Sequence, residues 1–355
     1  MSTLLLITGA GASFDSINEE LVPDETVVFR PPLTVDLFPF HSIIGAPIDP
    51  HSLECLKSHP IASQIGYNLF LRFRNKKNEM NLEQYLAELK NSKVKTQRSQ
   101  FWAVPLYLFE LFMNISQNYT ISKTPGLPSN YKSLLDRLNE SHYTQTIWLN
   151  LNYDLLADFA IKHSVVNKLE NLNDYMLLET PDSKKIKYIK PHGSIDWFKQ
   201  ISDSRVSLED VRLGKTPNDF ENLMSDEVVK AKVDIEGIIT ARPSNGYPAI
   251  TAPIGEYVFV CRRHIDAIIF DLRNTTDMLC IGFSALDKDI LELIRNNVEK
   301  ITKLKIVNGN KESAQQAYAR LKEHCGDKIS LSDDCIFDGG FTTFIQSGIK
   351  EFLEI

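Results

Sequence analysis

Five short apolar runs are spaced along this chain, and each ends in glycine or in polar residues. They occupy residues 4–7, 146–151, 186–189, 277–281 and 304–307. A short, continuous apolar run is typical of a strand that is buried on both faces of a parallel sheet. In open α/β sheets, ligands bind at the carboxyl ends of the strands. The pattern therefore predicts an α/β fold, an open parallel Rossmann-like sheet flanked by helices, with a ligand site at that edge.

In the segments between these runs, apolar residues recur at helical spacing. This spacing predicts helices over residues 81–89, 129–138, 287–298 and 311–324. The stretch 50–141 is too rich in apolar residues for a loop, so we expect a helical insertion module beside the sheet. Residues 202–234 are polar and charged, and we expect a helical or mobile surface insertion there. The whole chain, 1–355, is predicted to be one domain that carries these two insertions.

Composition narrows the class of protein. The chain has 355 residues, of which 43% are hydrophobic, so it can bury a large core. Its net charge of −7 argues against direct nucleic-acid binding. Two basic clusters, 72–77 and 184–190, are expected to be solvated faces. The segment 1–13 does not fit a signal peptide, and the aromatic-rich run 101–115 is too short to span a membrane. We expect a soluble, cytoplasmic protein.

The five cysteines are odd in number and scattered. They are Cys55, Cys261, Cys280, Cys325 and Cys335. No two of them have the short spacing of a structural zinc site, so the expected metal content is none. We expect all five to be reduced and mostly buried.

A glycine-rich turn follows the first apolar run. Gly9 and Gly11 let the backbone approach a ligand closely, and a helix that starts near Ser13 would direct its N–H groups at a pyrophosphate. Phe14 stands where the dinucleotide fingerprint has its third glycine, so a plain strand-to-helix connection remains an alternative. Farther along, the proline-stiffened loop 29–38 leads into a short helix start, and it can simply pack Phe38 and Phe40 at the surface.

Two further segments carry candidate chemistry. Asn152 has both donor and acceptor groups, so it can hold a ribose hydroxyl and a water together. Asp154 can instead cap the following helix. His192 can accept a proton near neutral pH from a ribose hydroxyl or an attacking water, and Ser194 can orient its ring. A lone histidine is more often a plain surface or core residue, so the residues alone leave that alternative open for His192.

These segments together resemble the sirtuin family, most closely its bacterial sirtuin-like NADase branch. The matching pieces are the turn 8–13, Asn152-Tyr153-Asp154, the run 190–194 and the Gly-hydrophobe-Ser segment at Gly282. The resemblance implies an NAD-binding domain, NAD as substrate, and Asn152 and His192 as the catalytic residues. It also implies that the loop 29–38 closes over NAD, where Arg30 or Thr34 can meet phosphate or ribose. It implies NAD contacts from Gly9, Ala10, Gly11, Ser13, Thr34, Asp154, Gly193, Gly282, Phe283, Ser284 and Asn308. For the turn at Gly282, a helix cap at Asp287 is an equally simple explanation.

The resemblance also implies an activity. Protein-deacetylating sirtuins carry a four-cysteine zinc ribbon, which this chain lacks, so the expectation is hydrolysis of NAD to nicotinamide and ADP-ribose without a metal. The bacterial relatives act in antiphage defence by depleting NAD, which requires gating by a separately encoded activator or by oligomerisation. The run 101–115 is either a contact for such a partner or a core helix. The alternatives are a non-catalytic subunit that binds NAD or ADP-ribose, and an NAD-dependent deacylase or ADP-ribosyltransferase.

Overall fold

A computed structural model describes residues 2–16, 30–38, 55–75, 82–121, 129–166, 169–234, 239–252, 259–329 and 335–355. The chain divides into two compact units. The first unit comprises Met1–Pro31, Ile121–His192 and Cys261–Ile355, and the second comprises Pro32–Thr120 and Gly193–Val260. In these described parts, no helix has the length and apolar character needed to cross a membrane.

The first unit is built on a seven-stranded sheet in the order β12-β11-β10-β1-β2-β4-β3. Neighbouring strands run parallel except β3 and β4, which pair antiparallel. The strands are β1 (Thr3–Thr8), β2 (Gln145–Asn150), β3 (Leu178–Glu179), β4 (Lys185–Ile189), β10 (Thr275–Ile281), β11 (Lys303–Val307) and β12 (Ile336–Phe337).

All five predicted strands are present and lie side by side in this sheet. The central strand β1 is buried along its whole length, as its unbroken apolar run predicts. Counted along the chain, the parallel strands follow the order 3-2-1-4-5-6 of a Rossmann-like sheet. The chain reverses direction across the sheet between β1 and β10, so this pair marks the topological switch point.

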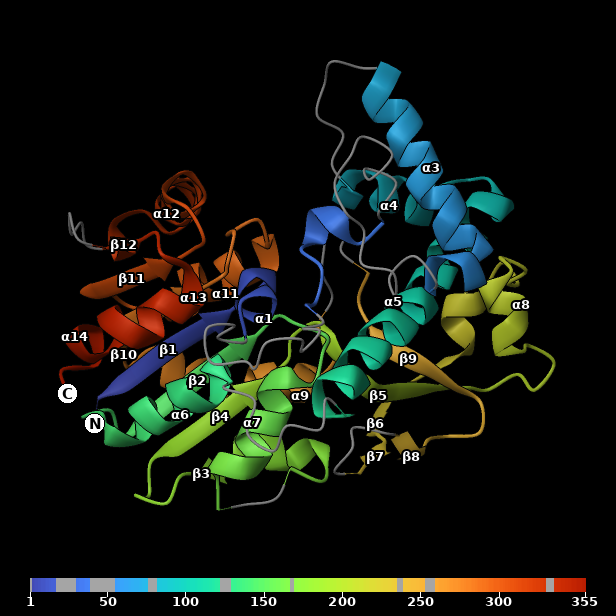
Figure 1. Cartoon of the computed structure of the whole chain (residues 1–355). Helices are drawn as coiled ribbons and strands as arrows, with labels where there is room; N and C mark the ends of the chain where they lie inside the picture. The colour runs from blue at the N-terminus through green and yellow to red at the C-terminus, as the bar shows by residue number, and fades with distance from the viewer. Residues whose placement is uncertain are drawn as a thin grey trace. The chain divides into compact units, whose positions relative to one another are not determined.

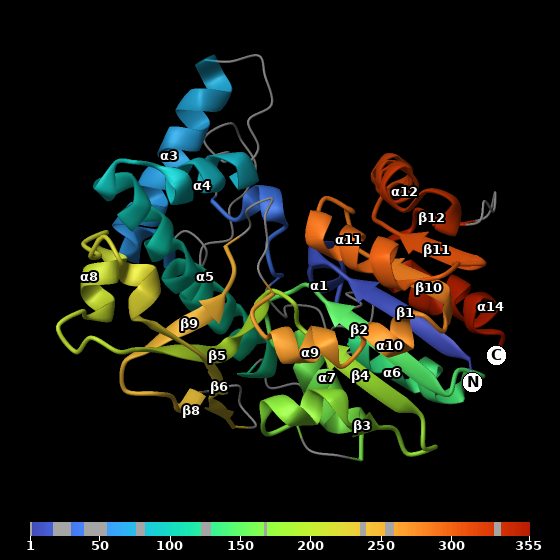
Figure 2. The ribbon, with the colours of Figure 1, turned by 180° about the vertical axis from the view of Figure 1, so that it is seen from behind.

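Helices flank both faces of this sheet. Figure 1 shows α6, α7, α13 and α14 over one face, and Figure 2, from behind, shows α9, α10 and α11 over the other. The predicted helices 129–138, 287–298 and 311–324 are confirmed as α6, α11 and α12. The bounds are α1 (Ala10–Phe14), α6 (Asn130–Glu140), α7 (Leu156–Ser164), α9 (Arg262–Asp266), α10 (Ile269–Leu272), α11 (Lys288–Asn297), α12 (Lys311–Cys325), α13 (Gly340–Thr343) and α14 (Ile349–Leu353).

The second unit combines helices with small antiparallel sheets. Strand β5 lies between β6 and β9, and β7 pairs with β8. The helices are α3 (Pro60–Asn75), α4 (Leu82–Asn91), α5 (Lys95–Ile121) and α8 (Leu208–Arg212), and the strands are β5 (Gly193–Ile201), β6 (Met224–Lys230), β7 (Lys232–Val233), β8 (Ile239–Ala241) and β9 (Gly246–Ile250). One core cluster is formed by Leu106, Ile201, Val206, Val211, Phe220 and Tyr247.

The two expected insertions have mixed structure. The described residues of 50–141 are largely helical: α3, α4 and α5 are grouped with the second unit, and α6 is grouped with the first. The predicted helix 81–89 corresponds to α4, although Asn81 lies outside the described residues. The stretch 202–234 contains α8 and also β6, with Phe220 fully buried. That the whole chain is one domain, with both stretches as insertions in it, stays a prediction.

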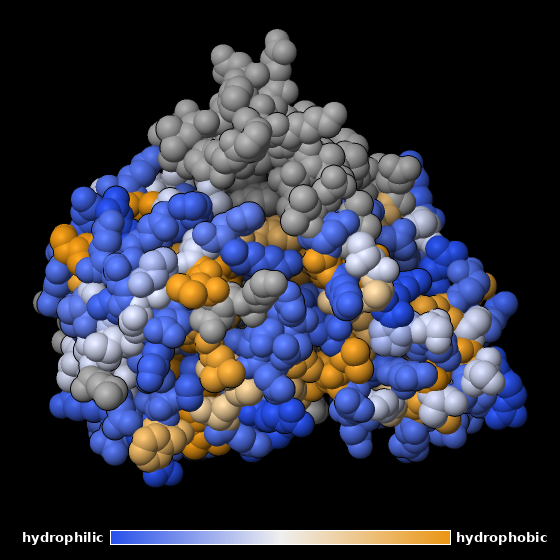
Figure 3. Space-filling view, turned by 90° about the horizontal axis from the view of Figure 1, so that it is seen from below, coloured by the Kyte–Doolittle hydropathy of each residue, from blue (hydrophilic) through white to orange (hydrophobic). Residues whose placement is uncertain are grey.

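The aromatic-rich run 101–115 lies inside α5, which continues through Pro105. Tyr107, Leu108 and Leu111 are buried, as a core helix requires. The face in Figure 3 is largely hydrophilic, with hydrophobic residues in small separate areas. Large exposed apolar side chains such as Phe270 do occur, at 73% exposure.

Candidate functional site

Two glycine turns meet at the switch point of the first unit. The N–H of Gly9 donates to the carbonyl of Ile281 at 3.0 Å, and the N–H of Gly11 donates to that of Gly282 at 3.2 Å. A Cβ on Gly9 would lie 2.5 Å from the Gly282 oxygen, and one on Gly282, whose φ is +60°, would lie 2.1 Å from the Ala12 nitrogen. Glycine is therefore required here for backbone packing between the turns after β1 and β10.

This packing bears on the predicted pyrophosphate contact. The N–H groups of Gly9, Gly11 and Ala12 all donate to backbone carbonyls. Helix α1 begins at Ala10, earlier than the expected start near Ser13, and has only five residues. A phosphate contact from this turn therefore stays a prediction, while the close approach of the two turns explains the glycines by itself.

Asn152 ties the end of β2 to the first glycine turn. Its Nδ2 donates to the Gly9 carbonyl at 2.9 Å and to Ser13 Oγ at 2.9 Å, and it lies 3.2 Å from the hydroxyl of Tyr131. Both hydrogens of the amide thus have acceptors within the protein. What Asn152 can offer a ligand is its amide oxygen, an acceptor suited to a ribose hydroxyl or a water.

His192 follows β4 and pairs with an aspartate 95 positions away in sequence. Its Nε2 lies 2.5 Å from Oδ2 of Asp287, and both side chains are buried. The other carboxylate oxygen, Oδ1, accepts the N–H of Ile290 at 3.1 Å and caps α11. Because a carboxylate only accepts, Nε2 is the nitrogen that donates to it, and Nδ1 is the ring nitrogen that can accept a proton.

Asp287 is the functional candidate that the sequence interpretation did not select. Its helix-capping position is readable from the sequence and is confirmed. Its pairing with His192 is not readable, because α11 and the end of β4 are brought together only by the sheet order. Asp287 is fixed by capping the start of α11, and from there it can orient the His192 ring. A histidine oriented by a carboxylate is the arrangement found in catalytic acid–base pairs.

A buried polar network lies next to the site. Nζ of Lys190 donates to the backbone carbonyl of Asp154 at 2.6 Å and lies 3.1 Å from Oδ2 of Asp158. Asp158 also accepts from the hydroxyls of Tyr188 and Tyr175, at 2.9 and 3.0 Å. The expectation that 184–190 is a solvated face is wrong for Lys190, which is 1% exposed. An acidic partner from α7 compensates its charge, and local sequence does not reveal such a partner.

Asp154 has a structural role, but it is not the N-cap residue of α7, because Leu155 occupies that position. Its Oδ1 accepts the N–H of Leu156 at 3.1 Å, at the beginning of α7. Burial raises the pKa of its carboxyl, and the nearby Lys190 partly offsets this rise. Contact of Asp154 with NAD stays a prediction.

The remaining predicted residues of the first unit lie at the same edge of the sheet. Phe283 is buried and Ser284 is exposed, both just after β10. Asn308 follows β11, and its Nδ2 donates to the Phe283 carbonyl at 3.4 Å. The ends of β1, β2, β4, β10 and β11 therefore gather every predicted site residue except Thr34 and Gly193.

Those two residues belong to the second unit. Thr34 opens a short 3₁₀ turn, Thr34–Asp36. Gly193 begins β5, where a Cβ would overlap the Ala249 carbonyl. In the first unit, Arg30 donates to the Phe14 carbonyl and lies 5.0 Å from that ring's centre. Phe29 and Phe40 lie outside the described residues.

The described cysteines are all free, as predicted, and four of the five are buried.

No protein-family model and no curated protein matches this chain.

Proposed function

We propose that this chain is a sirtuin-like NAD glycohydrolase that cleaves NAD to nicotinamide and ADP-ribose. The observation that carries the proposal is the pair of His192 and Asp287, buried at the carboxyl edge of the sheet. The Rossmann-like strand order supports it, because dinucleotides bind such sheets at the switch point. The resemblance of the Asn152 and His192 segments to sirtuin-like NADases supplies the substrate.

The chemistry requires little of the protein. The bond between the pyridinium nitrogen of nicotinamide and ribose C1′ breaks, the electron pair stays on that nitrogen so that nicotinamide leaves as a neutral pyridine, and the ribose passes through an oxocarbenium-like state. The oxygen of Asn152 orients the ribose or the attacking water. His192 takes the proton released as the water oxygen bonds to C1′, and Asp287 stabilises the resulting imidazolium. The neutral imidazole of His192 is restored when that proton passes to solvent.

A role in cells follows from the hazard of this activity. Unrestrained NAD cleavage would kill the cell that makes the enzyme, so the proposal includes gating by a separate activator or by assembly. Depletion of NAD in an infected bacterium is the proposed biological output, by analogy with the defence proteins that the chain resembles.

Nicotinamide release from NAD tests the proposal. The wild type should release nicotinamide, and His192→Ala should be slower by about 10²-fold or more, the range for loss of a general base. Asp287→Asn should be slower by at least about tenfold while α11 stays capped, because asparagine is an equally good cap but carries no charge. His163→Ala is the matched control, since His163 is exposed on α7.

The assay is run with pure protein and with lysate of phage-challenged cells. Release only in lysate supports the separate activator, and full rate with pure protein overturns the gating part. Equal rates in wild type and His192→Ala would contradict the catalytic assignment. Bound NAD without turnover in either setting would leave the chain a nucleotide-binding protein.

A further inference from the structure

A cluster of three metal-ligating side chains lies in the second unit, outside the NAD site. Cys55 and His59 are four residues apart, on one helical turn that precedes α3, and Glu110 lies in the middle of α5. One ligand atom from each residue lies within 4.8 Å of the other two. Both Cys55 and His59 are buried, and the Glu110 side chain is 42% exposed.

The three atoms suit one ion. Ligand atoms around a tetrahedral zinc ion lie about 3.5 Å apart, given bonds of about 2.0–2.3 Å. Sulfur, nitrogen and oxygen from Cys, His and Glu are the donors that zinc accepts, and the thiolate disfavours hard ions such as magnesium. A small contraction of these side chains is enough to reach bonding distance.

His59 is already oriented as a ligand. Its Nδ1 lies 3.0 Å from the Cys55 carbonyl oxygen and 3.1 Å from Ser58 Oγ, while Nε2 lies 3.1 Å from Oε2 of Glu110. Metal-bound histidines typically anchor the second ring nitrogen on a backbone carbonyl in this way. The ring edge also contacts Tyr107, with centroids 5.6 Å apart. The nitrogen that faces Glu110 is therefore the one held in place for an ion.

The charges balance for a divalent cation. Cysteine binds zinc as a thiolate, which the Cys55 thiol becomes by losing its proton. A bound cation displaces that proton, and thiolate plus carboxylate then neutralise its two charges. The nearby cation Arg212 is paired with Glu209 at 2.7 Å, which limits its repulsion of an ion.

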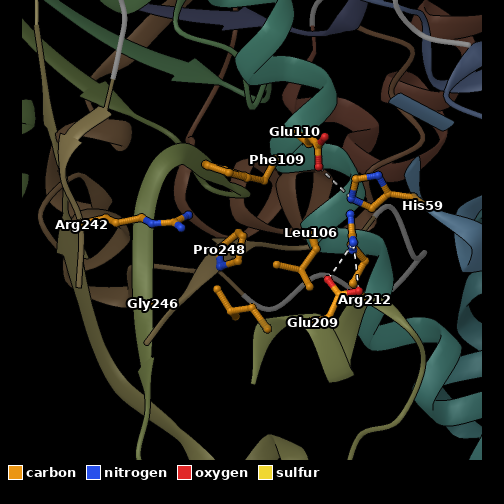
Figure 4. A pocket seen from close by; sticks show the side chains of 10 residues that line it. His59, Leu106, Phe109, Glu110, Glu209, Arg212, Arg242, Gly246 and Pro248 are labelled. Carbon is orange, nitrogen blue, oxygen red and sulfur yellow. Dashed lines mark hydrogen bonds and ion pairs between the residues drawn. The ribbon is translucent and has the colours of Figure 1, made fainter. Parts of the chain in front are cut away.

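The cluster opens on a cavity of about 250 Å³ within the same unit. His59 and Glu110 line it, and Figure 4 shows both at one end, with Arg242 at the other. Three protein ligands and an open side describe a zinc site that keeps a position for water or substrate, in contrast to a closed structural site.

From this geometry we infer that Cys55, His59 and Glu110 bind one zinc-class divalent ion whose fourth position faces the cavity. The site is independent of NAD cleavage, and neither its presence nor its failure bears on His192. The short-spaced cysteine pairs that are missing from the sequence do not exclude it, because its ligands come from two separate helical segments.

Cobalt(II) substitution tests the site directly. The full-length, reduced protein is stripped with a chelator and titrated with Co²⁺, and a thiolate-to-cobalt charge-transfer absorption should saturate at about one equivalent. One equivalent of Zn²⁺ should abolish it. Cys55→Ser should remove the absorption, whereas Cys280→Ser, a buried cysteine of the first unit, should keep it.

Glu110→Gln gives a second measurement that does not depend on changing a buried side chain. It should weaken Zn²⁺ binding at least about tenfold, with the circular dichroism spectrum unchanged. The inference is overturned if the wild type shows no cobalt–thiolate absorption, if Cys55→Ser retains it, or if Glu110→Gln binds Zn²⁺ as tightly as the wild type.

Discussion

Single residues in this protein carry two tasks at once. Asp287 caps α11 with one carboxylate oxygen and holds His192 with the other. Asn152 uses its amide nitrogen to hold the Gly9 turn, which leaves its oxygen for a ligand. Structural anchoring of this kind keeps a reactive side chain in one rotamer, which is what a positioned acid–base group needs.

A buried histidine should make stability depend on pH. His264 on α9 is 1% exposed, and its Nε2 donates to the Leu172 carbonyl at 2.8 Å. Burial lowers its pKa to about 4, from 6.5, against the opposing effect of that hydrogen bond. Between these values the unfolded chain binds more protons than the folded one, so stability falls as pH drops through this window.

Because of this residue, we expect the free energy of unfolding to be about 2 kcal/mol lower at about pH 5 than at about pH 7. Urea denaturation at the two pH values measures it. His264→Gln keeps a hydrogen-bond donor but does not titrate, so its pH dependence should be weaker by that amount. The exposed His163→Gln should behave like the wild type, and an unchanged slope in His264→Gln would refute the assignment.

At the scale of elements, the turns after β1 and β10 form the main structural feature of the site. Each strand end was predictable from its own apolar run. The contact between the two turns depends on β1 and β10 being neighbours, with residues such as Ile7 and Cys280 paired across them. Neither turn alone explains why alanine is excluded at Gly9.

Gly9→Ala should test this contact without backbone strain. Gly9 has an ordinary extended conformation, with φ −114° and ψ −171°, so the obstacle to a side chain is the backbone of the other turn: the Gly282 oxygen lies 2.5 Å from the new Cβ and the Phe283 Cα 3.1 Å. We expect a loss of about 1–3 kcal/mol of stability, the usual cost of overpacking. Thermal or urea unfolding measures it.

Gly309→Ala is the matched control for this prediction. No atom lies within 4 Å of a Cβ placed there, at the end of β11. Its stability should stay within about 1 kcal/mol of the wild type. Equal losses in the two variants would mean that the close approach of the turns is not what requires glycine.

At the scale of the whole molecule, each compact unit is assembled from separated stretches of chain. In the first unit this places His192, near the middle of the sequence, against Asp287. In the second unit it brings Glu110 of α5 to the turn that carries Cys55 and His59. Each candidate site is therefore a product of tertiary assembly within its own unit.

Ligand binding should raise the stability of the folded chain. In the His192→Ala variant, which spares the substrate, NAD at about 100 times its dissociation constant should add about 2.7 kcal/mol. A thermal melt would register this as a rise of several degrees. Nicotinamide alone, which lacks the pyrophosphate, should give a smaller shift. No shift with either NAD or ADP-ribose would argue against a nucleotide site.

The sequence by itself determined the elements that depend on local periodicity. Five buried strands, the amphipathic helices α6, α11 and α12, and the cap at Asp287 follow from apolar spacing and from capping chemistry, which act over a few residues. The two-residue strands β3 and β12 escaped this reasoning, because so short a strand has no pattern of its own.

Only the tertiary structure decided which of these pieces meet. The strand order places the ends of β4 and β10 on either side of β1, and so joins His192 to Asp287. Burial of Lys190 against Asp158 and the grouping of Cys55, His59 and Glu110 arise in the same way. Side chains distant in sequence become partners when the hydrophobic core draws their elements together, and no local pattern records that encounter.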